Sequence, residues 1–295
     1  MIIGSAKGGV TLPNKNNLSV AVGGGGGAPA GTIDGAGLQA YYKFNESSGN
    51  VINQADQVTN NDTNGADLVV NNGGDADHIV YEGSTDTPAN LPDVIRWNST
   101  STTDGGYADA NGAASLWNFL KYGDGDVNIA FTVCFWGKFS ALTNNTMLMT
   151  TTNNSRSSPW IGWNLKFYGS KFYSQINVGD AGGTGNESVV YANNFSNVLA
   201  DGSFHFYSLT YDQTLGSANY KIKRDNANLL TKNKTAISPV SGNTTEPLCF
   251  GHQMAGSETY IPPDYSIASL SLWSRILTDD EITEMYADGD GMQLC

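Results

Sequence analysis

The sequence predicts an all-β protein, an antiparallel β-sandwich with one short C-terminal helix and an extended N-terminal arm. Short runs of β-branched and aromatic residues recur between clusters of Gly, Asn, Asp, Ser and Pro, a pattern typical of strands joined by turns. Glycine accounts for 35 of 295 residues, and only 15% of the residues are charged. A coiled coil or helical bundle would instead be rich in Ala, Glu, Lys and Leu.

The first 37 residues are predicted to form an arm and a glycine-rich hinge. The arm contains the apolar run LSVAV, in which we expect Leu18, Val20 and Val22 to dock in an assembly. Five consecutive glycines follow at 23–27, and such a run favours neither helix nor strand because glycine loses much conformational entropy on ordering. The sandwich is therefore predicted to occupy residues 38–295.

Nine segments of the sandwich have strand composition and turn residues at their ends. They span 38–44, 131–139, 146–151, 160–167, 171–178, 203–211, 220–224, 248–251 and 266–274. Residues 50–110 are dense in Asn, Asp and Gly, so they predict long loops with one or two strands around Val69 and 94–97. In the closing segment, Ile267, Ser269, Ser271 and Trp273 alternate with Ala268, Leu270 and Leu272, which predicts one more apolar face.

One helix is predicted, near the C-terminus. Thr278 and Glu281 have the spacing of a capping box, and Ile282, Met285 and Tyr286 then fall on one helical face. We expect Gly289 to end the helix in the left-handed conformation.

Two further local features carry structural expectations. Asp225-Asn226 lies where a hairpin must reverse, and Asn tolerates the positive φ of such turns. The three cysteines are odd in number and widely spaced, which fits neither a disulfide framework nor a zinc site. We expect Cys134 and Cys249 to be buried thiols.

The charge balance excludes some partners. With 15 basic and 28 acidic residues the net charge is −13, so the surface would repel a nucleic acid backbone. No apolar stretch approaches the roughly 18 residues of a membrane span, which predicts no membrane insertion. The N-terminus lacks the cationic and apolar regions of a signal peptide.

Four segments, in order, suggest a family. They are LQAYYKFNESSGNVINQAD (38–56), FTVCFWGKF (131–139), DGSFHFYSLTYD (201–212) with YKIKRDNANL (220–229), and IASLSLWSRILTDDEITEMYADG (267–289). Over residues 38–290 the chain resembles the laminin G-like and pentraxin-like domains of the concanavalin A-like lectin/glucanase superfamily. The resemblance implies a jelly-roll sandwich, with Trp136 and Trp273 in the core. It also places His205 at the family's histidine position, where we expect a satisfied structural residue.

The same superfamily includes glucanases, which need two carboxylates on one strand face. The sequence has no Glu-x-Asp-x-Glu run. Three acidic pairs two residues apart lie in glycine-bearing turns, at Asp75/Asp77, Asp124/Asp126 and Asp288/Asp290, and the acids at 279–281 are explained by the N-terminus of the predicted helix. We therefore predict a protein that is not an enzyme and has no catalytic residues.

Calcium is the ligand that the resemblance implies most often, although no cofactor is predicted to be required. Pentraxin-like members place acidic ligands after a late strand, whereas FGHQM at 250–254 is followed by no carboxylate until Glu258. Other oxygen-rich loops could hold Ca²⁺. The candidate ligands are Asp75 with Asp77, Asp104 with Asp109, and Asp180 with Asn186.

Carbohydrate binding would need an exposed aromatic platform beside hydrogen-bonding groups. Trp160 follows the loop NNSRSSP, and Trp163 and Tyr168 lie nearby, so these three are the candidate sugar-stacking residues. The run WIGWNLKFY is equally typical of an ordinary half-buried strand.

Together the arm, the fold and the acidic Asn/Gly/Thr-rich composition suggest a virion component, such as a bacteriophage capsid decoration or a fibre or tail subunit. Its expected partners are other virion subunits and further copies of itself, with surface glycans as a further ligand. The alternative is a cell-surface or secreted bacterial adhesion module that binds carbohydrate, and a glycoside hydrolase comes third. Fold alone does not decide among them.

Overall fold

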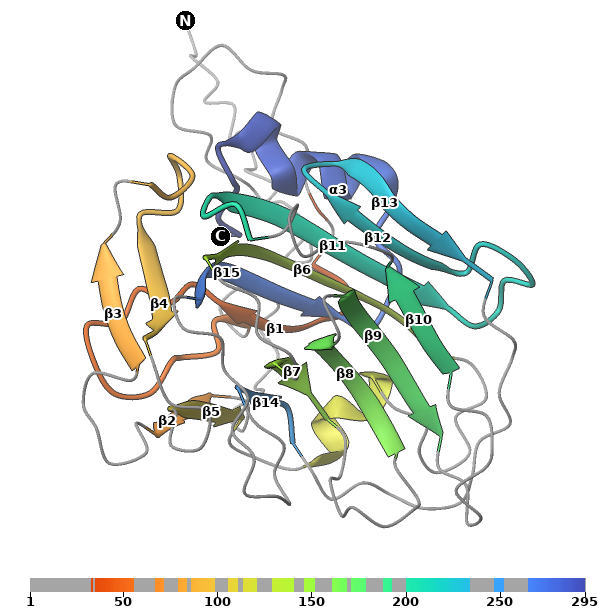
Figure 1. The fold of residues 1–295 in the computed structure, drawn as a ribbon, viewed down its shortest axis with the longest axis horizontal. Coiled ribbons are helices and arrows are strands. Elements are labelled where there is room, and N and C mark those ends of the chain that lie inside the picture. The colour runs from red at the N-terminus through yellow and green to blue at the C-terminus, as the bar shows by residue number, and fades with distance from the viewer. Residues whose placement is uncertain are drawn as a thin grey trace, which may run out of the picture.

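The computed structural model describes residues 33, 35–55, 67–71, 79–83, 86–98, 106–110, 114–120, 129–140, 146–151, 161–168, 171–178, 188–192, 200–233, 247–251 and 265–294. The strands in this part of the chain form two stacked sheets in which every pairing is antiparallel (Figure 1). The predicted β-sandwich with one short C-terminal helix is confirmed.

One sheet has eight strands and the other seven. The eight-stranded sheet contains, in spatial order, β13 (Ala227–Lys232), β12 (Tyr220–Arg224), β11 (Phe204–Asp212), β6 (Ala130–Phe139), β15 (Tyr265–Trp273), β4 (Asp93–Trp97) and β3 (Ile79–Gly83), with β1 (Leu38–Tyr42) also paired to β15. The seven-stranded sheet contains β10 (Ser188–Ala192), β9 (Lys171–Val178), β8 (Ile161–Tyr168), β7 (Thr146–Thr150), β14 (Cys249–Phe250), β5 (Tyr107–Ala110) and β2 (Leu68–Asn71).

The strand predictions hold along the periodic segments and fail in the Asn- and Gly-rich region. Residues 50–110 are expected to contain one or two strands, but the described part of this region contains four, namely β2, β3, β4 and β5. A 3₁₀ helix at Ala114–Leu120 and strand β10 were also not predicted. These elements are short, and they form because neighbouring strands offer backbone partners, which composition does not reveal.

The main core lies between the two sheets and is rich in aromatic residues. Phe139 stacks on Tyr265 with ring centroids 5.1 Å apart, and Phe135 stacks on Tyr207 at the same separation. Trp97 packs on Tyr265, again at 5.1 Å, and its other neighbour is Phe250 of the opposite sheet. Large rings therefore fill much of the space between the sheets.

A second apolar cluster, which we call the outer cluster, covers the outer face of the eight-stranded sheet. Trp136, Phe206 and Trp273 project from the strands into this cluster, and Ile282 and Met285 of the helix pack over them. Both predicted core tryptophans, Trp136 and Trp273, are buried, and so are the thiols of Cys134 and Cys249. The eight-stranded sheet thus lies between the seven-stranded sheet and the helix (Figure 1).

The closing strand β15 is buried along its whole length, and a β-bulge decides which residues face each layer. The register with β6 shifts between Ile267 and Ser269. As a result Ile267, Leu270 and Leu272 all belong to the core between the sheets. The predicted alternation, which placed Ile267 with the serines, is wrong here because a one-residue insertion moves all later side chains to the other face.

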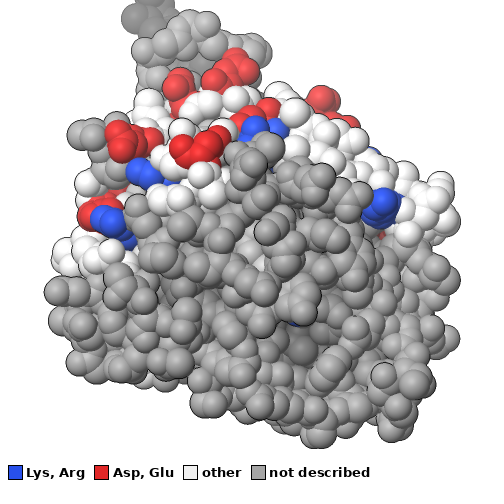
Figure 2. Space-filling view, in the orientation of Figure 1, with Lys and Arg blue, Asp and Glu red and all other residues white. Residues whose placement is uncertain are grey.

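The helix α3 (Asp279–Tyr286) begins as predicted and ends earlier. Thr278 and Glu281 form both hydrogen bonds of the capping box, and the acids of the first turn complement the helix dipole. Acidic side chains are visible along the upper border of Figure 2, where Figure 1 places α3. The left-handed cap is Ala287 with φ 48°, so the predicted stop at Gly289 is wrong by two residues.

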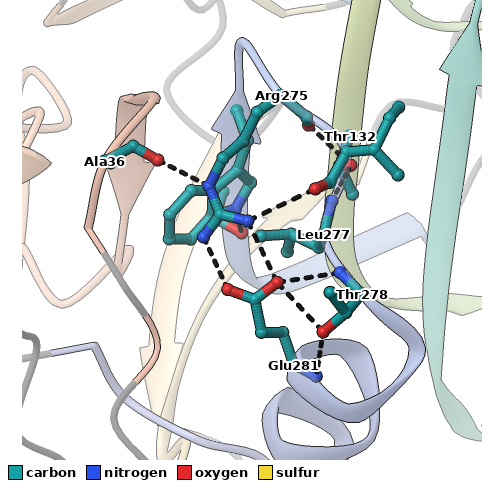
Figure 3. Close-up of polar contacts among 9 residues, drawn as sticks. Ala36, Thr132, Arg275, Leu277, Thr278 and Glu281 are labelled. Atoms are coloured by element: carbon teal, nitrogen blue, oxygen red, sulfur yellow. Dashed lines mark hydrogen bonds and ion pairs between the residues drawn. The ribbon is translucent and has the colours of Figure 1, made fainter.

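Arg275 links the arm, the closing strand and the helix (Figure 3). Its guanidinium donates to both carboxylate oxygens of Glu281, at 2.6 and 3.0 Å, and its Nε donates to the Ala36 carbonyl at 2.6 Å. The Thr132 hydroxyl of β6 donates to the Arg275 carbonyl and accepts from the Leu277 N–H. We call Ala36, Thr132, Arg275 and Glu281 the arginine node.

The last residues of the predicted arm already pack on the sandwich. Ile33 is buried in the outer cluster with Leu294 near the C-terminus. Gly37 adopts φ 79°, and a Cβ there would lie 3.1 Å from the Arg275 side chain. Glycine is therefore required at this point, where the chain turns past the node into β1.

We predict that Arg275→Met lowers the free energy of unfolding by about 2 kcal/mol, because it removes charged hydrogen bonds from half-buried groups. Urea denaturation measures the loss, and limited proteolysis should cut sooner near residue 36. The matched control is Lys223→Met, which breaks the more exposed pair with Asp279 and should cost below about 1 kcal/mol. Equal losses in the two variants would contradict a special role of the node.

Candidate functional site

Trp163 is not available for sugar stacking. Its exposed fraction is 0%, it packs against Phe131 in the core, and its Nε1 donates to Ser174 Oγ at 2.9 Å. The alternation of β8 turns Trp163, Leu165 and Phe167 inward. The prediction that Trp163 binds ligand is therefore wrong, and the half-buried strand interpretation applies.

The other predicted site residues stay predictions. Tyr168 ends β8, and its side chain lies outside the described part of the structure. Asp109 lies in β5, but Asp104, the other ligand of that candidate pair, lies outside the described residues. The same is true of Trp160, Asp75, Asp77, Asp180, Asn186 and the arm residues Leu18, Val20 and Val22.

His205 lies between two carboxylates at the start of β11. Its Nδ1 is 2.5 Å from Asp225 Oδ2, and its Nε2 is 2.8 Å from Asp201 Oδ2. Asp225 sits in the type I′ turn of the β12–β13 hairpin, with φ 49° followed by 61° at Asn226, as predicted for that turn. Its second carboxylate oxygen accepts the Phe206 N–H at 3.0 Å. His205 thus joins the segment before β11 to the hairpin turn.

This geometry makes His205 a structural residue. The hydrogen bond to Asp225 raises the pKa of the imidazole, and the bond to Asp201 adds to the effect against the cost of burial. Burial opposes ionisation of Asp201, but hydrogen bonds from the Ser203 N–H and from His205 lower its pKa. Because both ring nitrogens are engaged by carboxylates, neither is poised to take a proton from a substrate. The interpretation of His205 as a satisfied histidine is confirmed.

Among the described residues, no group of three His, Cys, Asp or Glu side chains could hold a metal ion. Each described strand carries at most one Asp or Glu, so none presents the carboxylate pair of a glycosidase. The calcium site remains a prediction.

The eight-stranded sheet carries a row of polar and aromatic residues on its outer face, beyond the area that α3 covers. The register aligns Val80 with Arg96, Arg96 with Ser266, Ser266 with Lys138, and Lys138 with Phe204. Residues paired across strands share a face. We call these five residues the outer strip. Sequence analysis missed it because it combines five strands whose register is fixed only by the fold.

The strip contains two cations, and a carboxylate lies near each of them. Arg96 Nη1 lies 3.6 Å from Glu82 Oε1, and Lys138 Nζ lies 3.5 Å from Asp86 Oδ2. Lys138 Nζ is also 5.9 Å from the centre of the Phe204 ring, within cation–π range. The strip therefore offers two positive groups and an aromatic ring on one face, whereas Ser266 between the two cations is buried.

Comparison with known proteins identifies the fold. No protein-family model and no curated protein sequence matches the chain. The laminin G-like resemblance therefore stays a prediction. In the part of the chain that the structure describes, no helix is both long and apolar enough to cross a membrane.

Solved toxin binding domains share the architecture. The binding domain of botulinum neurotoxin DC, solved with rat synaptotagmin II, has a TM-score of 0.57 at 12% identity and covers 85% of this chain and 51% of that chain. The binding domain of Paraclostridial Mosquitocidal Protein 1 has the same score and identity, with 85% and 52% covered. A structure reported with cell entry of botulinum neurotoxin type C through two ganglioside molecules scores 0.55 at 13% identity, with 85% and 51% covered. The chain spans about half the length of these structures, and at such low identity the likeness establishes the fold alone.

We predict that stability falls as pH rises through the folded-state pKa of His205. That pKa is raised above its ordinary 6.5, so the contribution of the imidazolium is complete below pH 6.5 and disappears above the folded-state pKa. Urea denaturation between pH 5.5 and 8.5 measures this slope. His205→Gln should remove the histidine-dependent part of it and cost about 1–3 kcal/mol at pH 6. An unchanged slope in that variant would contradict the assignment.

Proposed function

We propose that this chain is a non-catalytic recognition module that binds glycans on a cell or environmental surface. The observation that carries the proposal is the likeness of 85% of the chain to the binding domains of toxins, one of them reported with ganglioside-dependent cell entry. A sandwich with a rigid aromatic core suits this task, because binding groups on a stiff sheet lose little entropy when ligand binds.

The side chains support recognition rather than catalysis. His205, the histidine among the described residues, has both ring nitrogens engaged by Asp201 and Asp225. In the described strands, carboxylates do not occur in pairs. A polar and aromatic surface such as the outer strip can hold a sugar without changing it.

We further propose that residues 1–32 anchor the module to a larger assembly, and that this assembly is a virion. The apolar run at 18–22 would add a strand to a neighbouring subunit, with the glycines at 23–27 as the hinge. The buried Ile33 and the contact of Ala36 with Arg275 support this arrangement, because they fix the base of the arm on the sandwich. A secreted adhesion module is the second candidate, favoured by the same toxin likeness.

For the glycan-binding proposal, we expect the full chain to bind a subset of glycans on an array and to release no reducing ends from a panel of polysaccharides. Heat-unfolded chain is the control for nonspecific capture. A folded chain that binds no glycan would overturn the proposal, and the release of reducing ends would establish a glycosidase.

For the anchoring proposal, we expect deletion of residues 1–32 to abolish a large assembly while the sandwich stays folded. The deletion must stop before Ile33, because removing residues 33–36 would also damage the outer cluster and the arginine node. Mass measurement of the native and truncated proteins decides the outcome. A monomer in both cases would contradict anchoring and favour the adhesion module.

A further inference from the structure

We infer that the outer strip binds the negatively charged group of a glycan, a sugar carboxylate or a sulfate ester. This inference rests on the proposed glycan-binding function and names its ligand class and its site. The two cations of the strip, Arg96 and Lys138, are the groups that would contact the anion.

The spacing of the strip suits a single sugar residue and its substituent. Arg96 and Lys138 lie on β4 and β6 with β15 between them. Since neighbouring strands are about 4.8 Å apart, their backbones are separated by about 10 Å. Long side chains from both strands can meet over Ser266, which occupies the row between them. An anion placed there would receive the planar fork of Arg96 and the ammonium of Lys138.

Glu82 and Asp86 would compete only weakly with an anionic ligand for these two cations. The exposed fractions of the side chains are 37% for Glu82 and 70% for Asp86, against 32% for Arg96 and 23% for Lys138. Both separations exceed the 2.7–3.2 Å of a normal N–H···O hydrogen bond. Exposed ion pairs of this kind contribute little free energy, so a ligand that contacts both cations can displace these two carboxylates.

Phe204 supplies the apolar part of the site. Its ring lies in the same row as Lys138, is only partly buried, and packs on the outer cluster beneath it. A pyranose ring has an apolar face of C–H groups that packs on aromatic side chains, while its anionic substituent is held to one side. An isolated inorganic ion would use the cations and gain nothing from Phe204, which is why the site favours a charged sugar.

The overall charge of −13 does not prevent this binding. Repulsion from distant acids is screened beyond about 8 Å at physiological ionic strength. Among the described residues, the acids paired with the cations of the strip are Glu82 and Asp86. An anion that displaces these two carboxylates meets the two positive groups of Arg96 and Lys138.

The test is calorimetric titration of the full chain with 3′-sialyllactose, with 6-sulfo-N-acetyllactosamine, and with neutral lactose. We expect at least one anionic probe to bind and lactose to bind at least tenfold more weakly. The first two probes distinguish a carboxylate from a sulfate ester. Lys138→Gln should weaken the anionic probe about five- to tenfold, as loss of one charge-assisted contact implies. Arg96→Lys, which keeps the charge and loses the fork, should weaken it less.

The matched control is Lys232→Gln, the same change of charge on the exposed end of β13, away from the strip. It should leave the affinity unchanged, and thermal unfolding verifies that each variant is folded. Equal affinity for lactose and sialyllactose, equal effects of Lys138→Gln and Lys232→Gln, or binding of free sulfate as tight as that of the sulfated sugar would overturn the inference. Those results leave glycan binding itself intact, whereas binding of no probe and no array glycan would overturn both proposals.

Discussion

Strand β15 must bury both of its faces, and the structure depends on how its residues are divided between them. One face meets the seven-stranded sheet and the other meets α3 and the chain ends. Serines and leucines alternate in this strand, so a one-residue shift of its pairing register would place hydroxyls in the main core and leucines under the helix. The bulge at Ala268 prevents this, and it also sets the direction in which Trp273 and then Arg275 leave the sheet.

The arginine node depends on the direction in which the chain leaves β15. Trp273 points to the outer face, and the Arg275 guanidinium lies over its ring at 5.2 Å. From this position Arg275 reaches Glu281 of the capping box and the Ala36 carbonyl. Thr132 of β6 holds the intervening backbone at Arg275 and Leu277. A single side chain thus orients the helix and the base of the arm, so forces on residues 1–32 would act on the sandwich at this point.

The charged groups of the described residues are used mainly for local connections. His205 joins two segments through Asp201 and Asp225, and Arg275 joins three elements. The outer strip differs, because the ion pairs of Arg96 with Glu82 and of Lys138 with Asp86 are longer, at 3.6 and 3.5 Å. This contrast separates polar groups that stabilise the fold from groups that a ligand can recruit, and it places the candidate surface on the sheet face beside α3.

The sequence by itself determined the features that depend on neighbouring residues. The β-sandwich class, most long strands, the capping box at Thr278 and the turn at Asp225 follow from periodicity and from local backbone chemistry. Only the tertiary structure decided the inward direction of Trp163, the bulge in β15, the four strands between residues 50 and 110, and the outer strip. Each of these depends on which strands pair and in what register. Such pairings join residues far apart in the chain, and their free energy is gained only when the sheets are assembled.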